Sequence, residues 1–221
     1  MSELIRDYYD NGNVKIEEYY IDNKLHREDG PAIIRYYENG NIESKKYCVN
    51  NMYHRENGPA IFWYYKNGNI EYESYYINDK RHRSNGPAKI EYYKNGNISL
   101  EEYYINGNIH RKNGPAIIYY YENGNVKSQA YCIDNEYHRE DGPAVIEYYD
   151  NGNIKSKIYY INGYNVTIEY DMYKNKLSKQ TIEKECNNIN NLMVMKIICI
   201  ENNNKLLELV ESKIIMLQLS N

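Results

Sequence analysis

The heptapeptide YYKNGNI at residues 64–70 decides the fold, because the chain repeats it with a fixed period of 28 residues. Variants of this heptapeptide begin at residues 8, 36, 92, 120 and 148. In each copy an Asn-Gly pair separates two tyrosines from a β-branched residue, and this arrangement is a strong short-range signal for a β-hairpin. The sequence therefore predicts six hairpins of one design.

Two further landmarks recur with the same period. All five histidines and all five prolines lie in segments of the form His-Arg-x-x-Gly-Pro-Ala, which begin at residues 26, 54, 82, 110 and 138. A second pair of turn-forming residues follows each Asn-Gly pair after 11 residues, as at Asp22-Asn23 and Asn106-Gly107. No insertion interrupts the five full copies, so we expect every repeat to have the same local structure.

The number of turns in a repeat determines how the repeats stack. In an array whose repeats are related by translation, the chain must return to its starting direction after each repeat. Each repeat therefore needs an even number of chain reversals. We expect a type I′ turn, with positive φ at both Asn11 and Gly12, and a second two-residue turn at Asp22-Asn23. We interpret the Gly-Pro segment as an offset within one longer crossing, since proline lacks a donor. The expected fold is all-β, an elongated single-layer antiparallel β-meander built from 28-residue repeats.

Tyrosine is strongly favoured over other aromatic residues, with 29 Tyr against one Phe and one Trp. This bias indicates that the phenolic hydroxyl is needed, and that many positions are half-exposed. Consecutive residues of a strand point to opposite faces, so the paired tyrosines predict one row of tyrosines on each face. The second tyrosines of the pairs form our candidate interaction surface: Tyr37, Tyr65, Tyr93, Tyr121 and Tyr149.

The C-terminal residues leave the repeat pattern. We expect a repeat array over residues 1–163 and a capping region over residues 164–221, because repeat arrays need a capped end. Residues 173–177 read as a worn copy of the repeat, and residues 192–200 as a buried strand. Apolar residues at helical spacing predict an amphipathic helix over residues 205–219. The cap is therefore expected to be a small α/β region.

The hairpin with its Tyr-Tyr-x-Asn-Gly-Asn-Ile motif resembles the MORN repeat, particularly its variant form. The longer unit with His-Arg-x-x-Gly-Pro-Ala is similar to tandem arrays in repeat proteins of giant DNA viruses and some bacteria. The resemblance covers residues 5–163. It implies an extended β-meander that contacts other proteins and, in some members, membranes or lipid head groups. It implies no enzyme activity and no cofactor.

The recurring His-Arg pairs are the remaining candidates for a site. The second turn would place Tyr19 opposite His26, so we assign the histidines a structural role and expect no metal site. The arginines would stack on an aromatic ring or support the Gly-Pro bend. The alternative is a ladder that binds anions such as phosphate, through Arg27, Arg55, Arg83, Arg111 and Arg139.

Composition limits the classes of function. A net charge of −4 argues against nucleic acid as a partner, and the chain lacks the known nucleophile, phosphate-loop and zinc motifs of enzymes. No secretion signal is evident, so we expect an intracellular, non-secreted protein with reduced cysteines. The leading hypothesis is a non-catalytic scaffold that binds another protein. The alternatives are an adaptor that binds anionic lipid and a viral structural component, and an exposed end strand could pair two arrays end to end.

Overall fold

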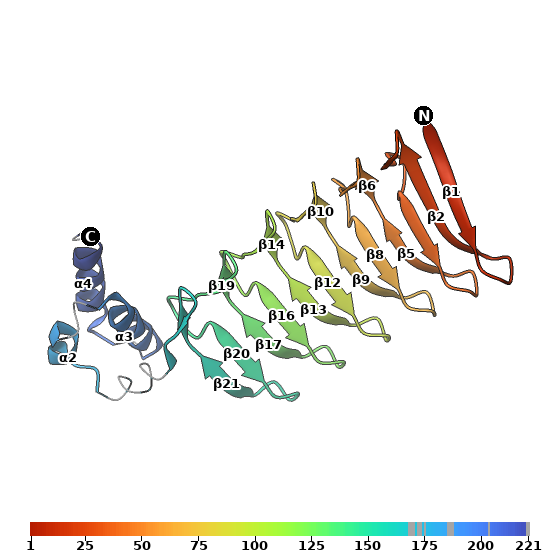
Figure 1. Cartoon of the computed structure of the whole chain (residues 1–221). Helices are drawn as coiled ribbons and strands as arrows, with labels where there is room; N and C mark the ends of the chain where they lie inside the picture. The colour runs from red at the N-terminus through yellow and green to blue at the C-terminus, as the bar shows by residue number, and fades with distance from the viewer. Residues whose placement is uncertain (168–170, 172–173, 175, 185–187, 203, 220–221) are drawn as a thin grey trace. The chain divides into compact units, whose positions relative to one another are not determined.

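The computed structural model describes residues 1–221 except 168–170, 172–173, 175, 185–187, 203 and 220–221 (Figure 1). Part of the expected worn repeat at residues 173–177 therefore lies outside the described residues. The chain divides into two compact units, residues 1–127 and residues 128–221. This division lies before the boundary that we expect at residue 163, which is where the repeat pattern of the sequence ends.

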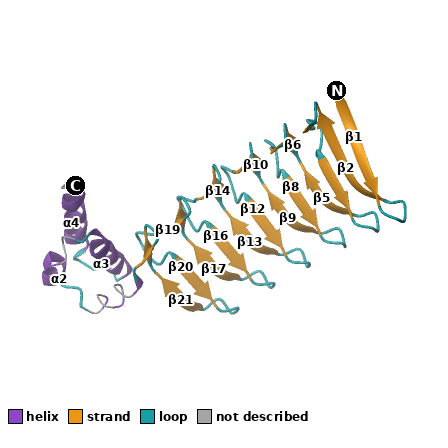
Figure 2. Cartoon of the chain, in the orientation of Figure 1, coloured by secondary structure: helices purple, strands orange, loops and turns teal. Residues whose placement is uncertain are grey.

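The first unit is an antiparallel meander, in which each long strand pairs with the long strands before and after it (Figures 1 and 2). Its long strands in spatial order are β1 (Ser2–Tyr8), β2 (Val14–Ile21), β4 (Ile33–Tyr36), β5 (Ile42–Lys46), β8 (Ile61–Tyr64), β9 (Ile70–Ser74), β12 (Lys89–Tyr92), β13 (Ile98–Glu102) and β16 (Ile117–Tyr120). No helix covers either face of this sheet within residues 1–127, all of which are described. The predicted single-layer β-meander is thus confirmed.

Short hairpins extend the long strands at the end away from the Asn-Gly loops. They comprise β3 (Lys24–Leu25), which pairs with β2, and the pairs β6 (Cys48–Val49) with β7 (Met52–Tyr53), β10 (Tyr76–Ile77) with β11 (Lys80–Arg81), and β14 (Tyr104–Ile105) with β15 (Asn108–Ile109). The chain then passes through the Gly-Pro segment and returns to the main sheet without a further reversal, since β2 pairs directly with β4. The Gly-Pro segment is therefore an offset, as predicted.

The two turns of a repeat differ in type, and only the second agrees with our expectation. The second turn has positive φ at both residues, 49° at Asp22 and 61° at Asn23, as a type I′ turn requires. In the Asn-Gly loop of residues 8–14, only Gly12 has positive φ, at 84°. Tyr9 pairs with Asn13 through its backbone N–H, so the loop has three residues. The prediction of a type I′ turn at Asn11-Gly12 was therefore wrong.

A side-chain hydrogen bond explains the longer Asn-Gly loop. The side-chain Oδ1 of Asn11 accepts the backbone N–H of Asn13 at 2.9 Å, and the same bond recurs between Asn39 and Asn41. This Asx turn stabilises an ordinary turn before the glycine, so that only the glycine needs left-handed geometry. The pairing of β1 with β2 contains a bulge next to this loop, where the register shifts between Asp7 and Tyr8.

The described residues of the second unit form the last repeats and three helices. Its long strands are β17 (Val126–Ala130), β20 (Val145–Tyr148) and β21 (Ile154–Ile158), of which β17 begins just before the unit boundary. Its short hairpins pair β18 (Cys132–Ile133) with β19 (Glu136–Tyr137), and β22 (Tyr160–Ile161) with β23 (Tyr164–Asn165). The helices are α2 (Lys179–Lys184), α3 (Ile189–Glu201) and α4 (Leu207–Leu219). They pack on Tyr159, Ile161 and Val166 in one buried apolar cluster, and so cover the last repeat.

The strand that we predicted at residues 192–200 is wrong, because these residues lie in helix α3. Asn188 caps this helix, since its Oδ1 accepts the backbone N–H groups of Asn190 and Asn191. A continuous apolar run does not distinguish a buried strand from a buried helix, and α3 is apolar around most of its circumference. The predicted helix over residues 205–219 is confirmed as α4, with Val210 and Ile214 buried. No helix among the described residues is long and apolar enough to cross a membrane.

Candidate functional site

The second tyrosine of each pair joins one repeat to the next. The Tyr37 hydroxyl donates a 2.7 Å hydrogen bond to the backbone carbonyl of Tyr64, and Tyr65 and Tyr93 make the same bond to the repeats that follow them. Asparagine amides add a parallel set, as where Asn41 Nδ2 donates to the carbonyl of Lys66 at 3.0 Å. These bonds fix the spacing of adjacent hairpins, and therefore the shape of the surface that the tyrosines line.

In several pairs the hydroxyl of the first tyrosine donates to a side chain of an adjacent strand. Tyr36 donates to Glu17 at 3.1 Å, and Tyr120 donates to Glu101 at 2.9 Å. Burial and the nearby Glu17 carboxylate raise the pKa of Tyr36 to about 12. These carboxylates thus accept hydrogen bonds from tyrosines of the array.

The arginine ladder has a structural use throughout the array. The guanidinium of Arg83 lies 4.0 Å from the centre of the Tyr75 ring and donates to the carbonyl of Pro87 at 3.1 Å. A Cβ atom at Gly86 would lie only 3.1 Å from the Arg83 Cζ, so glycine permits this close approach. The other arginines stack in the same way, at distances of 3.8 to 4.0 Å: Arg27, Arg55, Arg111 and Arg139.

The histidines connect adjacent repeats. His26 donates its backbone N–H to the carbonyl of Tyr19, as the predicted register requires. The Nδ1 atom of His82 accepts the backbone N–H of Asn106, in the second turn of the next repeat, at 3.2 Å. Sequence reasoning missed this contact, because the two residues are 24 positions apart and only the stacking of the repeats brings them together.

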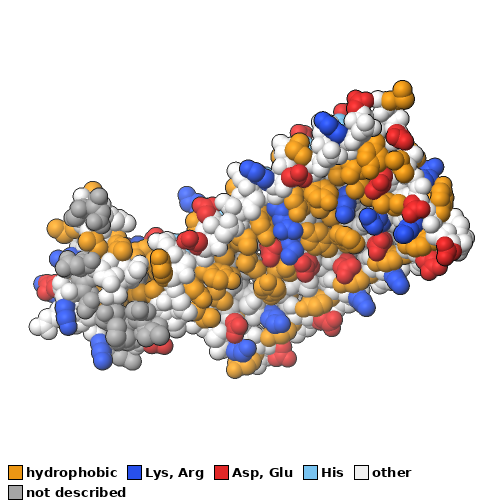
Figure 3. Space-filling view, in the orientation of Figure 1, with side chains coloured by type: hydrophobic (Ala, Val, Ile, Leu, Met, Phe, Trp, Pro, Cys, Tyr) orange, Lys and Arg blue, Asp and Glu red, His pale blue; other side chains and the backbone are white. Residues whose placement is uncertain are grey.

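A groove of about 830 Å³ lies on one face of the first unit, and it is the candidate functional site. Cross-strand partners Ser44, Trp63, Tyr72 and Glu91 define this face, which we name the Trp63 face. Three of the five tyrosines predicted as an interaction surface line the groove near the Asn-Gly loops: Tyr37, Tyr65 and Tyr93. Tyr121 and Tyr149 are not among its lining residues. In Figure 3 hydrophobic side chains form a band over the strands of the first unit, with Lys and Arg side chains within it.

Charged residues occupy opposite ends of this groove. Lys46 and Arg81 lie towards the short hairpins, whereas Glu43 and Glu71 lie next to the Asn-Gly loops. The Lys46 Nζ atom is 5.5 Å from the centre of the Trp63 ring. Arg81 Nη2 donates to the Tyr72 hydroxyl at 3.2 Å. The groove therefore combines aromatic surface with separated positive and negative ends.

Sequence reasoning did not select Lys46, Trp63 or Arg81, because it looked for what the repeats share. The positions equivalent to Lys46 hold Ser74 and Glu102, and the next position equivalent to Trp63 holds Glu91. Departure from the repeat pattern was the available signal. A residue that only the array itself needs tends to recur in every copy, whereas a residue present in one copy can serve a local site.

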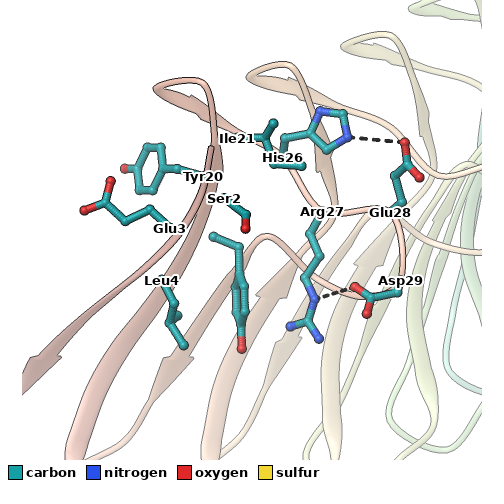
Figure 4. A pocket seen from close by; sticks show the side chains of 10 residues that line it. Ser2, Glu3, Leu4, Tyr20, Ile21, His26, Arg27, Glu28 and Asp29 are labelled. Atoms are coloured by element: carbon teal, nitrogen blue, oxygen red, sulfur yellow. Dashed lines mark hydrogen bonds and ion pairs between the residues drawn. The ribbon is translucent and has the colours of Figure 1, made fainter.

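A second hollow, of about 590 Å³, lies beside strand β1 (Figure 4). Several of its polar side chains already contact each other, since Arg27 Nε bonds to Asp29 Oδ1 at 2.8 Å and His26 Nε2 lies 3.6 Å from Glu28 Oε1. This hollow therefore offers a ligand fewer unpartnered charges than the groove on the Trp63 face.

Comparison with known families agrees with this repeat design. The model of the MORN repeat variant matches residues 4–22, 33–50, 61–78, 117–132 and 144–162. Each matched segment contains one Asn-Gly loop with a strand on either side. No curated protein matches the chain. The matched segments and the antiparallel meander together support a MORN-like repeat protein.

Proposed function

We propose that this protein is a non-catalytic scaffold that binds another protein through the groove on the Trp63 face. The observation that carries the proposal is the position of Trp63, the single tryptophan of the chain, in a groove with several tyrosines and two basic side chains. Tryptophan, tyrosine and arginine dominate the binding energy of protein interfaces. MORN repeats are generally non-enzymatic scaffold motifs that bind proteins or membranes.

The rigidity of the groove favours protein binding. The tyrosines at its Asn-Gly end are held by hydrogen bonds to the next repeat, so they lose little conformational freedom when a partner binds. Aromatic side chains also add a large contact area at low entropic cost. A preformed surface of this kind suits an extended segment that lies across several strands.

Membrane binding is the competing function for the same repeats. A surface that binds anionic lipid needs basic side chains that reach the head groups. In the groove, Glu43 and Glu71 lie near the Asn-Gly loops and would repel such head groups. The arginine ladder is engaged in stacking on tyrosines. These features favour a protein partner.

A peptide selection tests the proposal. The full chain is immobilised and used to select from a random heptapeptide phage library, in parallel with the variant Trp63→Glu. Glutamate is compatible with the fold at this position, because Glu91 occupies it in the next repeat. We expect the full chain to enrich related peptides and the variant to lose them. Equal enrichment by both proteins, or none by either, would refute the groove as a protein-binding site, and flotation with phosphatidylserine vesicles then tests the membrane function.

A further inference from the structure

Two basic side chains of the groove lack an acidic partner. In residues 1–127, which the structure describes completely, no carboxylate forms an ion pair with Lys46 or Arg81. The Nε atom of Arg81 is buried and has no hydrogen-bond partner among the described residues. Leaving such donors unpaired in a partly dry environment costs free energy, which an incoming acceptor would offset.

The acidic residues of the same face do not satisfy these cations. Glu91 pairs with Lys89 at 2.9 Å, and Lys89 also lies 3.4 Å from Glu102. Glu43 and Glu71 lie beside the tyrosines at the Asn-Gly end, where they contribute, after burial, to raising the pKa of Tyr37. The positive end of the groove is therefore left without an acid from the chain itself.

Burial and one nearby cation disfavour the charge of Lys46. Burial lowers its pKa, and the nearby Arg35 lowers it further. Its nearest favourable neighbours are aromatic rings, Trp63 at 5.5 Å and Tyr53 at 6.0 Å. A bound carboxylate would stabilise the charged amine and accept hydrogen bonds from it.

We propose that Lys46 and Arg81 form a carboxylate-binding site within the groove, and that its occupant is an extended peptide segment that carries an aspartate or glutamate beside an aromatic or aliphatic residue. This inference rests on the proposed function, because it names the chemistry of the partner that the groove binds. The carboxylate lies at the Lys46–Arg81 end, and the apolar neighbour packs on Trp63 and Tyr72. Basic residues of the segment complement Glu43 and Glu71 at the other end.

The repeats themselves supply substitutions that preserve the fold. Serine replaces Lys46 one repeat later, as Ser74, and isoleucine replaces Arg81, as Ile109. The variants Lys46→Ser and Arg81→Ile therefore remove the charges and leave Trp63 in place. Lys94→Gln is the matched control, because it removes one positive charge from a loop residue that does not line the groove.

The first measurement is the composition of the selected heptapeptides. We expect the full chain and Lys94→Gln to enrich peptides with Asp or Glu next to an apolar residue, and Lys46→Ser and Arg81→Ile to lose the acidic preference. Enrichment without acidic residues, or an acidic preference that survives both substitutions, overturns the carboxylate site and leaves the scaffold function standing. Absence of any enrichment by the full chain overturns both.

The second measurement locates the bound peptide. The strongest selected peptide is synthesised without tryptophan, so that Trp63 is the only fluorescent tryptophan present. We expect the peptide to shift the Trp63 emission, and its affinity to fall about tenfold or more in either charge variant, since a charged hydrogen bond is lost. The same peptide with Asn or Gln in place of its acid should weaken equally on the full chain. Unchanged affinity for that amide peptide overturns the inference.

Discussion

Tyr65 donates its phenolic hydroxyl to the backbone carbonyl of Tyr92, 2.7 Å away and one repeat later. The same bond connects Tyr9 to Tyr36, and so recurs from the first hairpin onwards. At these positions the bond favours tyrosine over phenylalanine, because a phenyl ring would fill the same space but would leave the carbonyl without this donor. Bonds between repeats thus explain part of the tyrosine bias, and three of the tyrosines that make them, Tyr37, Tyr65 and Tyr93, also line the groove.

Tyr65→Phe tests this bond. We expect the free energy of unfolding to fall by about 1 kcal/mol, the usual net value of a hydrogen bond. Urea unfolding followed by circular dichroism measures the change. Tyr119→Phe is the control, because Tyr119 is 44% exposed and should tolerate the loss of its hydroxyl. Equal effects of the two substitutions would contradict a specific role for the Tyr65 hydroxyl.

Arg83→Lys should weaken the array although it conserves the charge. A lysine cannot stack its planar group on Tyr75 and donate to the Pro87 carbonyl at the same time. We expect a loss of about 1 to 2 kcal/mol in the free energy of unfolding. Arg35→Lys, at an exposed position of strand β4, should leave the urea midpoint unchanged. A double-mutant cycle with Tyr75→Leu measures the coupling, and additive effects would show that the stack contributes nothing.

The sequence predicts those features that depend on neighbouring residues or on the period. The second turn, the register of Tyr19 with His26 and the offset at Gly-Pro all follow from local rules. The type of the Asn-Gly loop was missed, because the Asn11 side chain stabilises a different turn. Helix α3 was mistaken for a strand, since tertiary burial decides between the two for an apolar run. The groove could not be predicted from the sequence, because its walls come from several repeats.

His82→Ala should destabilise the contact between adjacent repeats. The substitution removes the Nδ1 acceptor of the Asn106 backbone N–H, and we expect the free energy of unfolding to fall by about 1 kcal/mol. His82→Asn is the matched variant, because its side-chain oxygen can occupy the position of Nδ1 and should restore part of the loss. Urea unfolding of the three proteins measures the effect. A stable alanine variant would show that the histidine is dispensable.

Cysteine labelling should report on folding, because the described cysteines are shielded. Cys48 and Cys132 are each 2% exposed, and Cys199 is 0% exposed. Burial also raises the pKa of the Cys199 thiol, so little of the reactive thiolate forms at neutral pH. We expect a short pulse of iodoacetamide to leave these three residues unmodified in the native protein and to modify them in urea, as read by peptide mass spectrometry. Rapid native labelling of Cys48 would contradict its burial.

Alkaline pH should destabilise the array in two stages. Burial raises the pKa of the Cys48 thiol from 9.0 to about 11 and, together with Glu17, the pKa of Tyr36 from 10.0 to about 12. A raised pKa means that the folded state favours the protonated group. The resulting stability is complete below the unfolded pKa and is lost as the pH rises through the folded value. We therefore expect the urea midpoint to fall between about pH 9 and pH 12. Cys48→Val should make the fall between about pH 9 and pH 11 smaller, and an unchanged fall in that range would rule out the Cys48 contribution.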